Sequence, residues 1–280
     1  MRRPRRTVVD INRLESEELR TYLSRGSWNI AILTDFAGME VYKADSDEAL
    51  RSSFSVVGEF PRQIQILKST SIIGGLSGRQ KGLISRMIDD AQTRDFGKFC
   101  SLVRDYVDGD QRFKADIESK RQLAREHLAG MAEEMANLAV DYSAMQRNFT
   151  EAEVRQVRLD KGAPLAVRKK LFRLSAKMAG DFFELHPHSR KWPADREWPN
   201  KFLFRFALLT HLHFFEWVRG GSPLNLSADK IRNDIVDLNF ATYGTFFDGL
   251  MTNDRKQRRL YIEAKTVLEE FIIPISRATN

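Results

Sequence analysis

The 280-residue chain has little cysteine and no long apolar stretch. Cys100 is its one cysteine, which excludes a disulfide framework and any zinc site built from several thiolates. Its apolar runs are far shorter than the ~20 residues of a membrane-spanning helix, so we expect no membrane partner. The basic start, MRRPRR, is followed at residues 7–12 by no apolar signal segment, and we therefore expect a cytoplasmic protein.

Acidic residues are fewer than basic ones. The chain has 45 Lys and Arg against 38 Asp and Glu, which is a formal net charge of +7 at pH 7. This surplus favours an anionic partner such as nucleic acid, although a well-solvated basic protein has the same composition. Hydrophobic residues make up 42% of the chain, enough for the core of one large domain or two small ones.

Both ends of the chain have the pattern of an α/β fold. Short apolar runs predict strands, which cover residues 7–11, 29–34, 62–68, 246–252 and 271–275. Helical patterns lie between them, at residues 16–23, 36–44 and 254–270. Asp35 is placed to cap the second of these helices. Because strands that alternate with helices form parallel sheets, we predict one mostly parallel sheet, flanked by helices, from the two ends.

The middle of the chain is helical in pattern. Its clearest feature is an apolar stripe in steps of three and four, formed by Leu128, Met131, Met135, Leu138, Tyr142 and Met145. The stripe is short for a coiled-coil seam, so we interpret it as core. Thr150 and Glu153 have the spacing of a capping box, and the apolar run over residues 202–217 predicts a deeply buried helix. We therefore divide the chain into an α/β domain, residues 1–85 with 200–280, and a large all-helical insertion, residues 86–199.

Acidic side chains stand where the predicted strands end. Asp10 lies near the end of the first strand, Glu40 lies in the helix after the second, and Asp254 follows residues 246–252. Asp234 and Asp237 precede a helical-looking segment, residues 238–247, that leads into that strand. Parallel sheets bind ligands at the carboxyl ends of their strands, and clustered carboxylates bind hard divalent cations. Since soft ligands are missing, the expected cofactor is Mg²⁺ or Mn²⁺.

Four motifs, in this order, resemble those of the PIN-like (PilT N-terminus-like) nuclease domain family, whose fold is related to that of flap nucleases. They are a strand ending in Asp10-Ile11-Asn12, Glu40 in the helix after an early strand, Asp237 with small residues at 241 and 244, and a strand ending in Thr252-Asn253-Asp254. The resemblance covers roughly residues 6–85 and 200–275 and implies a PIN-like sheet. A minimal PIN domain lacks a counterpart of residues 90–200.

The resemblance implies a divalent-metal-dependent hydrolase, most simply an endoribonuclease that cleaves RNA phosphodiesters. The implied catalytic residues and metal ligands are Asp10, Glu40, Asp237 and Asp254, with Asp234 in reserve for the third place. The metal ions would lower the pKa of a bound water and stabilise the departing oxygen. Asn12 and Thr252 would orient the ligands or bound water from a second layer. RNA processing, a toxin or phage defence would all suit this chemistry.

Basic residues near these positions predict contacts with RNA phosphates. They are Arg168, Lys169 and Lys170 in the insertion, and Arg255 and Lys256 directly after Asp254. The expected partner is single-stranded or tRNA-like RNA, and a homo-oligomer or a protein partner stays open. Trp192 and Trp198 would either stack on unpaired bases or pack under their own loop. The alternative function is a catalytically silent PIN-like scaffold that binds nucleic acid or protein.

Overall fold

The computed structural model describes residues 2–44, 46–134, 138–159, 164–188, 191–224 and 227–277. Within these ranges the strands are β1 (Arg5–Val9), β2 (Asn29–Leu33), β3 (Ile64–Ile66) and β4 (Gly249–Met251). The α-helices are α1 (Glu17–Ser24), α2 (Asp35–Lys43), α3 (Asp47–Ser55), α4 (Thr70–Gly74), α5 (Leu83–Met87), α6 (Asp90–Val107), α7 (Lys114–Glu134), α8 (Leu138–Gln146), α9 (Glu151–Arg158), α10 (Leu165–Leu185), α11 (Phe202–Arg219), α12 (Ala228–Gly244) and α13 (Arg255–Arg277). Short 3₁₀ turns are η1 (Ile11–Arg13), η2 (Val57–Glu59), η3 (Pro61–Gln63), η4 (Gln111–Phe113) and η5 (Asp195–Asn200).

The four strands form one parallel sheet in the order β3-β2-β1-β4. Strand β1 is central: its Thr7 is in register with Ala31 of β2 on one side and with Gly249 of β4 on the other. The sheet therefore unites the two ends of the chain. This confirms the prediction that the strands ending near Asp10, Thr34 and Thr252 are neighbours in a parallel α/β sheet.

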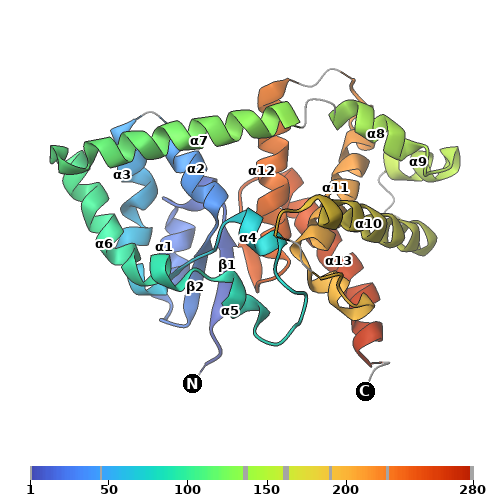
Figure 1. Ribbon diagram of the computed structural model, residues 1–280, viewed down its shortest axis with the longest axis horizontal. Coiled ribbons are helices and arrows are strands. Elements are labelled where there is room, and N and C mark those ends of the chain that lie inside the picture. Colours follow the sequence, from blue (N-terminus) through green and yellow to red (C-terminus); the bar gives the residue numbers. More distant parts are fainter. Residues whose placement is uncertain are drawn as a thin grey trace.

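Helices cover both faces of this sheet, because successive strand side chains point to opposite faces. Val8 of β1 and Ile32 of β2 belong to a core that includes α11, α12 and α13. Val9 and Leu33, the next residues along each strand, belong to a second core with α1, α3 and α6. In Figure 1 the sheet and its N-terminal helices occupy one half of the molecule, and α8 to α11 with α13 occupy the other.

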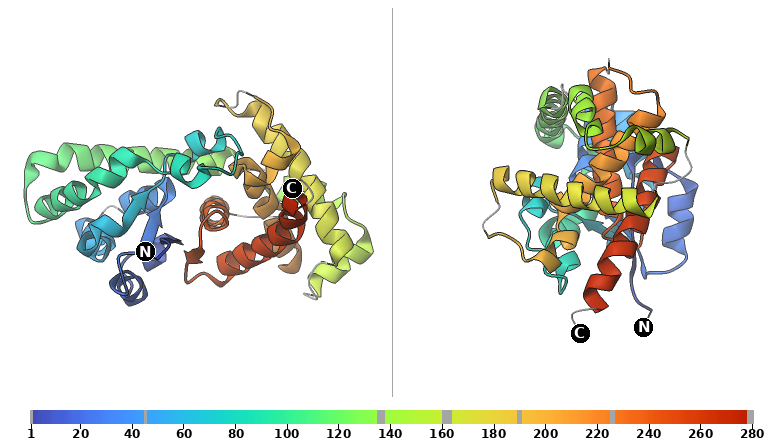
Figure 2. Two further views of the ribbon diagram at one scale, coloured as in Figure 1. Left: turned by 90° about the horizontal axis from the view of Figure 1, so that it is seen from below. Right: turned by 90° about the vertical axis from the view of Figure 1, so that its right-hand side faces the viewer.

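The long helix α7 runs across these two halves, as Figures 1 and 2 show, and it packs on α2 and on α12. Helix α11 lies at the centre of the helical half and contacts α9, α10, α12 and α13. Its residues are buried almost all round, as the apolar run predicted. No helix in the described ranges combines the length and apolarity needed to cross a membrane. The domain division at residues 86 and 199 stays a prediction.

The strand predicted at residues 7–11 is found at Arg5–Val9, and three other predicted strands differ more from the structure. Residues 271–275 are helical and continue α13, so the strand predicted there is wrong. A short apolar run is compatible with a buried helix as well as a strand, and periodicity cannot separate the two. Of residues 246–252 only Gly249–Met251 form β4, because 245–248 turn out of α12. Of residues 62–68 only Ile64–Ile66 form β3.

Helix starts follow local hydrogen-bond chemistry. The residue that caps α2 is Thr34, whose Oγ1 accepts from the Ala37 amide (3.1 Å), and not Asp35 as predicted. Asp35 is the first helical residue, and its carboxylate accepts from the main-chain N–H and the hydroxyl of Thr70 (2.7 and 2.9 Å). The capping box of Thr150 and Glu153 at the start of α9 is confirmed.

The predicted apolar stripe belongs to two helices, α7 and α8. Leu128, Leu138 and Tyr142 are buried in one core, and Met131 and Met145 pack against it. Residue Met135 lies outside the described residues. The stripe is therefore part of the chain's own core, as interpreted.

Candidate active site at the carboxyl end of the sheet

Asp10 lies at the carboxyl end of the central strand and is buried, with 3% of its surface exposed. Its Oδ2 accepts hydrogen bonds from Asn12 Nδ2 (2.6 Å) and from Thr252 Oγ1 (2.7 Å). The same Thr252 oxygen accepts from the Asp254 amide (3.0 Å), and Asn12 Oδ1 accepts from the Asn253 amide (3.1 Å). The two motifs from opposite ends of the chain are thus joined side by side.

Asp237 reaches the same region from α12. Gln257 links it to Asp254: the side-chain Nε2 of Gln257 donates to Asp237 Oδ1 (3.3 Å), and its main-chain N–H donates to Asp254 Oδ1 (2.7 Å). Position 244 requires a small residue for a steric reason: a Cβ on Gly244 would lie 3.0 Å from Leu250 Cβ and 3.1 Å from a ring carbon of Tyr261. Helix α12 can therefore lie close against β4 and α13.

Burial and mutual charge make this cluster costly to ionise. Burial raises the pKa of Asp10, and the charge of Asp254 adds to the rise, while the hydrogen bonds of Asp10 oppose it. Burial also raises the pKa of Asp237, to about 7; the Lys256 ammonium lowers it, whereas the charges of Asp254, Asp10 and Asp234 raise it further. Asp10, Asp237 and Asp254 are therefore within electrostatic reach of one another.

Glu40 has a different set of contacts. Its Oε2 accepts from Lys43 on the same helix (2.7 Å), and its buried Oε1 has no hydrogen-bond partner among the described residues. Nowhere in the described ranges are three His, Cys, Asp or Glu side chains grouped tightly enough to hold a metal ion as they stand. Convergence of all four acids on one cation stays a prediction.

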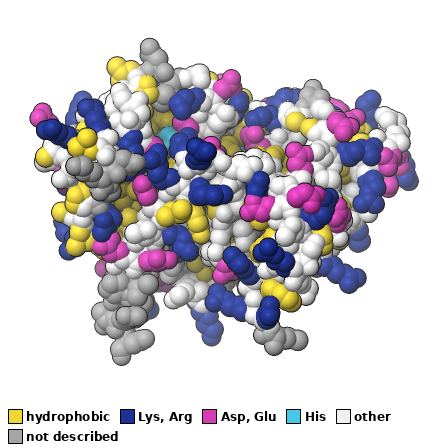
Figure 3. All heavy atoms as spheres, turned by 180° about the vertical axis from the view of Figure 1, so that it is seen from behind, with side chains coloured by type: hydrophobic (Ala, Val, Ile, Leu, Met, Phe, Trp, Pro, Cys, Tyr) yellow, Lys and Arg dark blue, Asp and Glu magenta, His cyan; other side chains and the backbone are white. Residues whose placement is uncertain are grey.

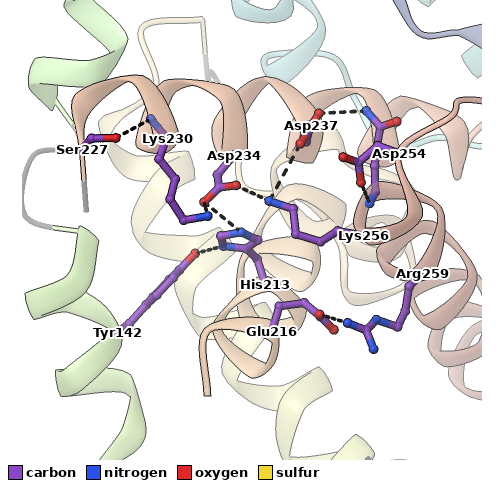
Figure 4. A network of polar contacts seen from close by, with 11 residues as sticks. Tyr142, His213, Glu216, Ser227, Lys230, Asp234, Asp237, Asp254, Lys256 and Arg259 are labelled. Carbon is purple, nitrogen blue, oxygen red and sulfur yellow. Dashed lines mark hydrogen bonds and ion pairs between the residues drawn. The ribbon is translucent and has the colours of Figure 1, made fainter. Parts of the chain in front are cut away.

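Asp234, the reserve candidate, is the centre of a buried network that Figure 4 shows. Its Oδ1 accepts from Lys256, while its Oδ2 faces His213 Nε2 (3.4 Å) and Lys230 Nζ (3.6 Å). The hydroxyl of Tyr142 is 2.6 Å from His213 Nδ1. Although burial raises the pKa of Asp234, His213 and Lys256 bring it well below its ordinary value. Asp234 has Lys256, His213 and Lys230 within ion-pair range of its two oxygens, whereas Asp237 has Lys256 alone, at 3.9 Å. Asp237 is therefore the better candidate for a metal ligand.

The predicted RNA-binding residues differ in their surroundings. Arg168 pairs with Glu270 (2.7 Å) and Lys170 with Glu153 (2.6 Å), so each has a carboxylate partner. Lys169 and Arg255 are exposed. On the face shown in Figure 3, basic and acidic side chains are interspersed and form no single basic stripe.

The two tryptophans pack against their own surroundings. The rings of Trp192 and Trp198 lie 5.1 Å apart, and both contact Phe183. Trp198 is 9% exposed and Trp192 is 53% exposed. Packing therefore accounts for Trp198, while an outward surface of Trp192 is left uncovered.

A cavity among the described residues has no lining residue in common with the four predicted acids. Its volume is about 1070 Å³, and it is lined by residues of α2, α6 and α7, among them Asp35, Tyr42 and His127. The candidate active site at the carboxyl end of the sheet is therefore not this cavity.

The contacts of three residues in this region were not predicted. Gln257 follows Asp254 by three positions, which is the spacing of a capping box, so it could have been recognised. Tyr142 and His213 come from α8 and α11, and no spacing in the sequence relates them to Asp234. Comparison of the chain with protein-family models, with curated proteins and with solved structures finds no match.

Proposed function

We propose that the protein is a divalent-metal-dependent nuclease of PIN-like type that hydrolyses RNA phosphodiesters. The observation that supports this most is the set of shared hydrogen bonds that links Asp10 to Asp254 through Thr252, and Asp254 to Asp237 through Gln257. Ligands of open parallel sheets bind at this edge. Acidic clusters whose charges raise one another's pKa are found preferentially at functional sites.

The donor set fits a hard cation such as Mg²⁺ or Mn²⁺, since it consists of carboxylate oxygens. Asp10, Asp237 and Asp254 would hold the ion, and a cation there would offset the charge repulsion that raises the pKa of Asp237. The buried Oε1 of Glu40, which lacks a partner among the described residues, makes Glu40 the candidate for a fourth ligand. When bound, such ions lower the pKa of water and stabilise a leaving oxygen.

The chain's own residues would prepare this site. Thr252 and Asn12 hold one oxygen of Asp10 by hydrogen bonds and would thereby orient the carboxylate. Gln257 holds Asp237 and Asp254 in a fixed relation to each other. The helical insertion, residues 86–199, would select or position the RNA, with the exposed Lys169 and Arg255 as phosphate contacts.

The test is cleavage of single-stranded RNA, of tRNA-like RNA and of single-stranded DNA by the purified protein in Mg²⁺ or Mn²⁺. We expect RNA to be cleaved and EDTA to abolish cleavage. Asp10→Asn and Asp254→Asn should each lower the rate by at least about a hundredfold, because an amide keeps the shape of the carboxylate but loses its charge. Asp229→Asn is the matched control: Asp229 is 79% exposed in α12, and its variant should keep the wild-type rate.

Two results would reject this function. If RNA is bound but never cut in either metal, the protein is better described as a catalytically silent scaffold. If cleavage survives both EDTA and Asp10→Asn, the reaction does not use this carboxylate cluster.

A further inference from the structure

The side chain of Lys256 lies between two carboxylates of the cluster. Lys256 is in the first turn of α13, two residues after Asp254. Its ammonium donates to Asp234 Oδ1 and lies 3.9 Å from Asp237 Oδ2, as Figure 4 shows. The side chain is 27% exposed, so it is partly open to solvent. A cation is thus held directly beside a predicted metal ligand.

This position is built by buried residues from three other helices. Tyr142 of α8, His213 of α11 and Asp234 of α12 form a continuous chain of polar contacts that ends at Lys256. Tyr142, His213 and Asp234 are at most 4% exposed. Buried polar side chains in a connected network have little freedom to move. The ammonium is therefore held in place, unlike that of an ordinary surface lysine.

The ammonium has hydrogen-bonding capacity left. It carries three N–H donors, and its hydrogen-bond acceptor among the described residues is Asp234. Asp237 at 3.9 Å is within ion-pair range and beyond hydrogen-bond range. A lysine ammonium is a compact point charge that binds phosphate oxygens well. The remaining donors suit an oxyanion that approaches beside Asp237.

We propose that Lys256 is a phosphate-binding residue, whose ammonium contacts a backbone phosphate of the nucleic acid next to Asp237, and that Asp234 positions it. The proposal rests on the proposed function for the identity of the phosphate. It gives Asp234 a role other than metal binding. It also gives α8 and α11 a role in the site, because Tyr142 of α8 contacts His213 of α11, and His213 faces Asp234.

The experiment compares Lys256→Ala with Lys256→Arg and with Lys265→Ala. Lys265 lies on the same helix and pairs with Glu269 at the surface (3.9 Å), so it is the matched control. Binding of a short fluorescent single-stranded RNA is measured in EDTA between about 50 and 200 mM salt. Cleavage rates in Mg²⁺, Mn²⁺ affinity and thermal unfolding are measured on the same proteins.

A phosphate contact has a specific signature in these measurements. Lys256→Ala should lower the log–log salt slope of RNA binding by about 0.7, the value for one contact with a single strand, and lower the cleavage rate by about a hundredfold. Lys256→Arg should restore the slope, because it restores the charge. Mn²⁺ affinity should not fall, because Lys256 repels the ion, and Lys265→Ala should match the wild type.

Asp234→Asn tests the positioning role. It should leave the salt slope unchanged, because Lys256 keeps its charge, but it should lower the cleavage rate. The double variant with Lys256→Ala should cleave no more slowly than Lys256→Ala alone, because the two residues act as one unit. Independent, additive losses would show that Asp234 does not act through Lys256.

The proposal is overturned if Lys256→Ala has the wild-type salt slope, if the wild type binds no RNA, or if the variant loses Mn²⁺ binding. These results are distinct from failure of the proposed function. A wild type that cuts no RNA, together with a reduced slope in Lys256→Ala, would reject the nuclease and keep the phosphate contact. Normal cleavage by the wild type, together with an unchanged salt slope in Lys256→Ala, would keep the nuclease and reject the phosphate contact.

Discussion

Replacing Asp237 by Asn should stabilise the metal-free protein, and it should do so much more at pH 8 than at pH 5. The carboxyl group is largely buried, with 23% of the side chain exposed. Its pKa is raised to about 7 from an ordinary value of 3.8, mainly by burial, with further contributions from Asp254 and Asp10. Asn keeps an oxygen that can accept the hydrogen bond from Gln257 but carries no charge.

The size of the effect follows from linkage between protonation and folding. Between about pH 4 and pH 7 the folded protein keeps a proton on Asp237 that the unfolded chain has released. The free energy of unfolding of the wild type therefore falls as pH rises through this window, and the loss is complete above pH 7. The difference between 3.8 and about 7 corresponds to about 4 kcal/mol, of which about 3 kcal/mol develops between pH 5 and pH 8.

The assay is urea unfolding of both proteins in EDTA at these two pH values. The stability of Asp237→Asn relative to the wild type should increase by about 3 kcal/mol from pH 5 to pH 8. Asp229→Asn, on the exposed side of the same helix, should show no such change. Adding Mg²⁺ at pH 8 should stabilise the wild type more than the variant, since only the wild type keeps the full set of charges.

One result would refute the reasoning. If Asp237→Asn changes stability by the same amount at pH 5 and at pH 8, the charge of Asp237 costs the folded state nothing. The acids would then not be close enough to share a cation, and the residue would act only as a hydrogen-bond acceptor for Gln257.

Four further variants test the packing and the hydrogen bonds of the site and of two helices. Gly244→Ala should lower the free energy of unfolding by about 1–3 kcal/mol, because its Cβ would meet Leu250. Gly38→Ala should raise it by about 0.5–1 kcal/mol, because nothing lies within 4 Å of that Cβ. Urea unfolding measures both variants, and equal effects would contradict the close approach of α12 to β4. Thr252→Val should cost about 2 kcal/mol at pH 8, since it removes the buried donor to Asp10; an unchanged urea midpoint would show that this bond contributes little. Thr150→Ala should cost about 1 kcal/mol through loss of the capping box of α9, read from the thermal unfolding curve, and no shift would mean that α9 is held by packing alone.

Local patterns were sufficient for much of the fold. The apolar runs before Asp10 and Thr34 predicted two neighbouring parallel strands, because short apolar runs alternating with helices are buried on both faces. The apolar run of α11 predicted its burial, and Thr150 with Glu153 predicted the start of α9. In each case the signal is a short-range one: side chains a few residues apart determine which face is apolar or which amide is capped.

Other features depend on packing between distant segments. Residues 271–275 continue α13, whereas the short apolar run by itself suits a helix or a strand. Thr34 caps α2, and the carboxylate of Asp35 instead accepts hydrogen bonds from Thr70 at the start of α4. The contact between Asp35 and Thr70 cannot be read from the sequence around either residue.

The candidate site shows the same division. The acids at the strand ends could be named from the sequence, because the end of a strand is a local feature and parallel strands end at one edge of the sheet. Their partners could not: Lys256 meets Asp234, and Asp234 meets His213, through the packing of α11, α12 and α13. Contacts between helices depend on how the helices cross, and periodicity within one helix does not contain that information. The sequence therefore located the carboxylates and the lysine after Asp254, and only the tertiary structure placed that lysine between Asp234 and Asp237.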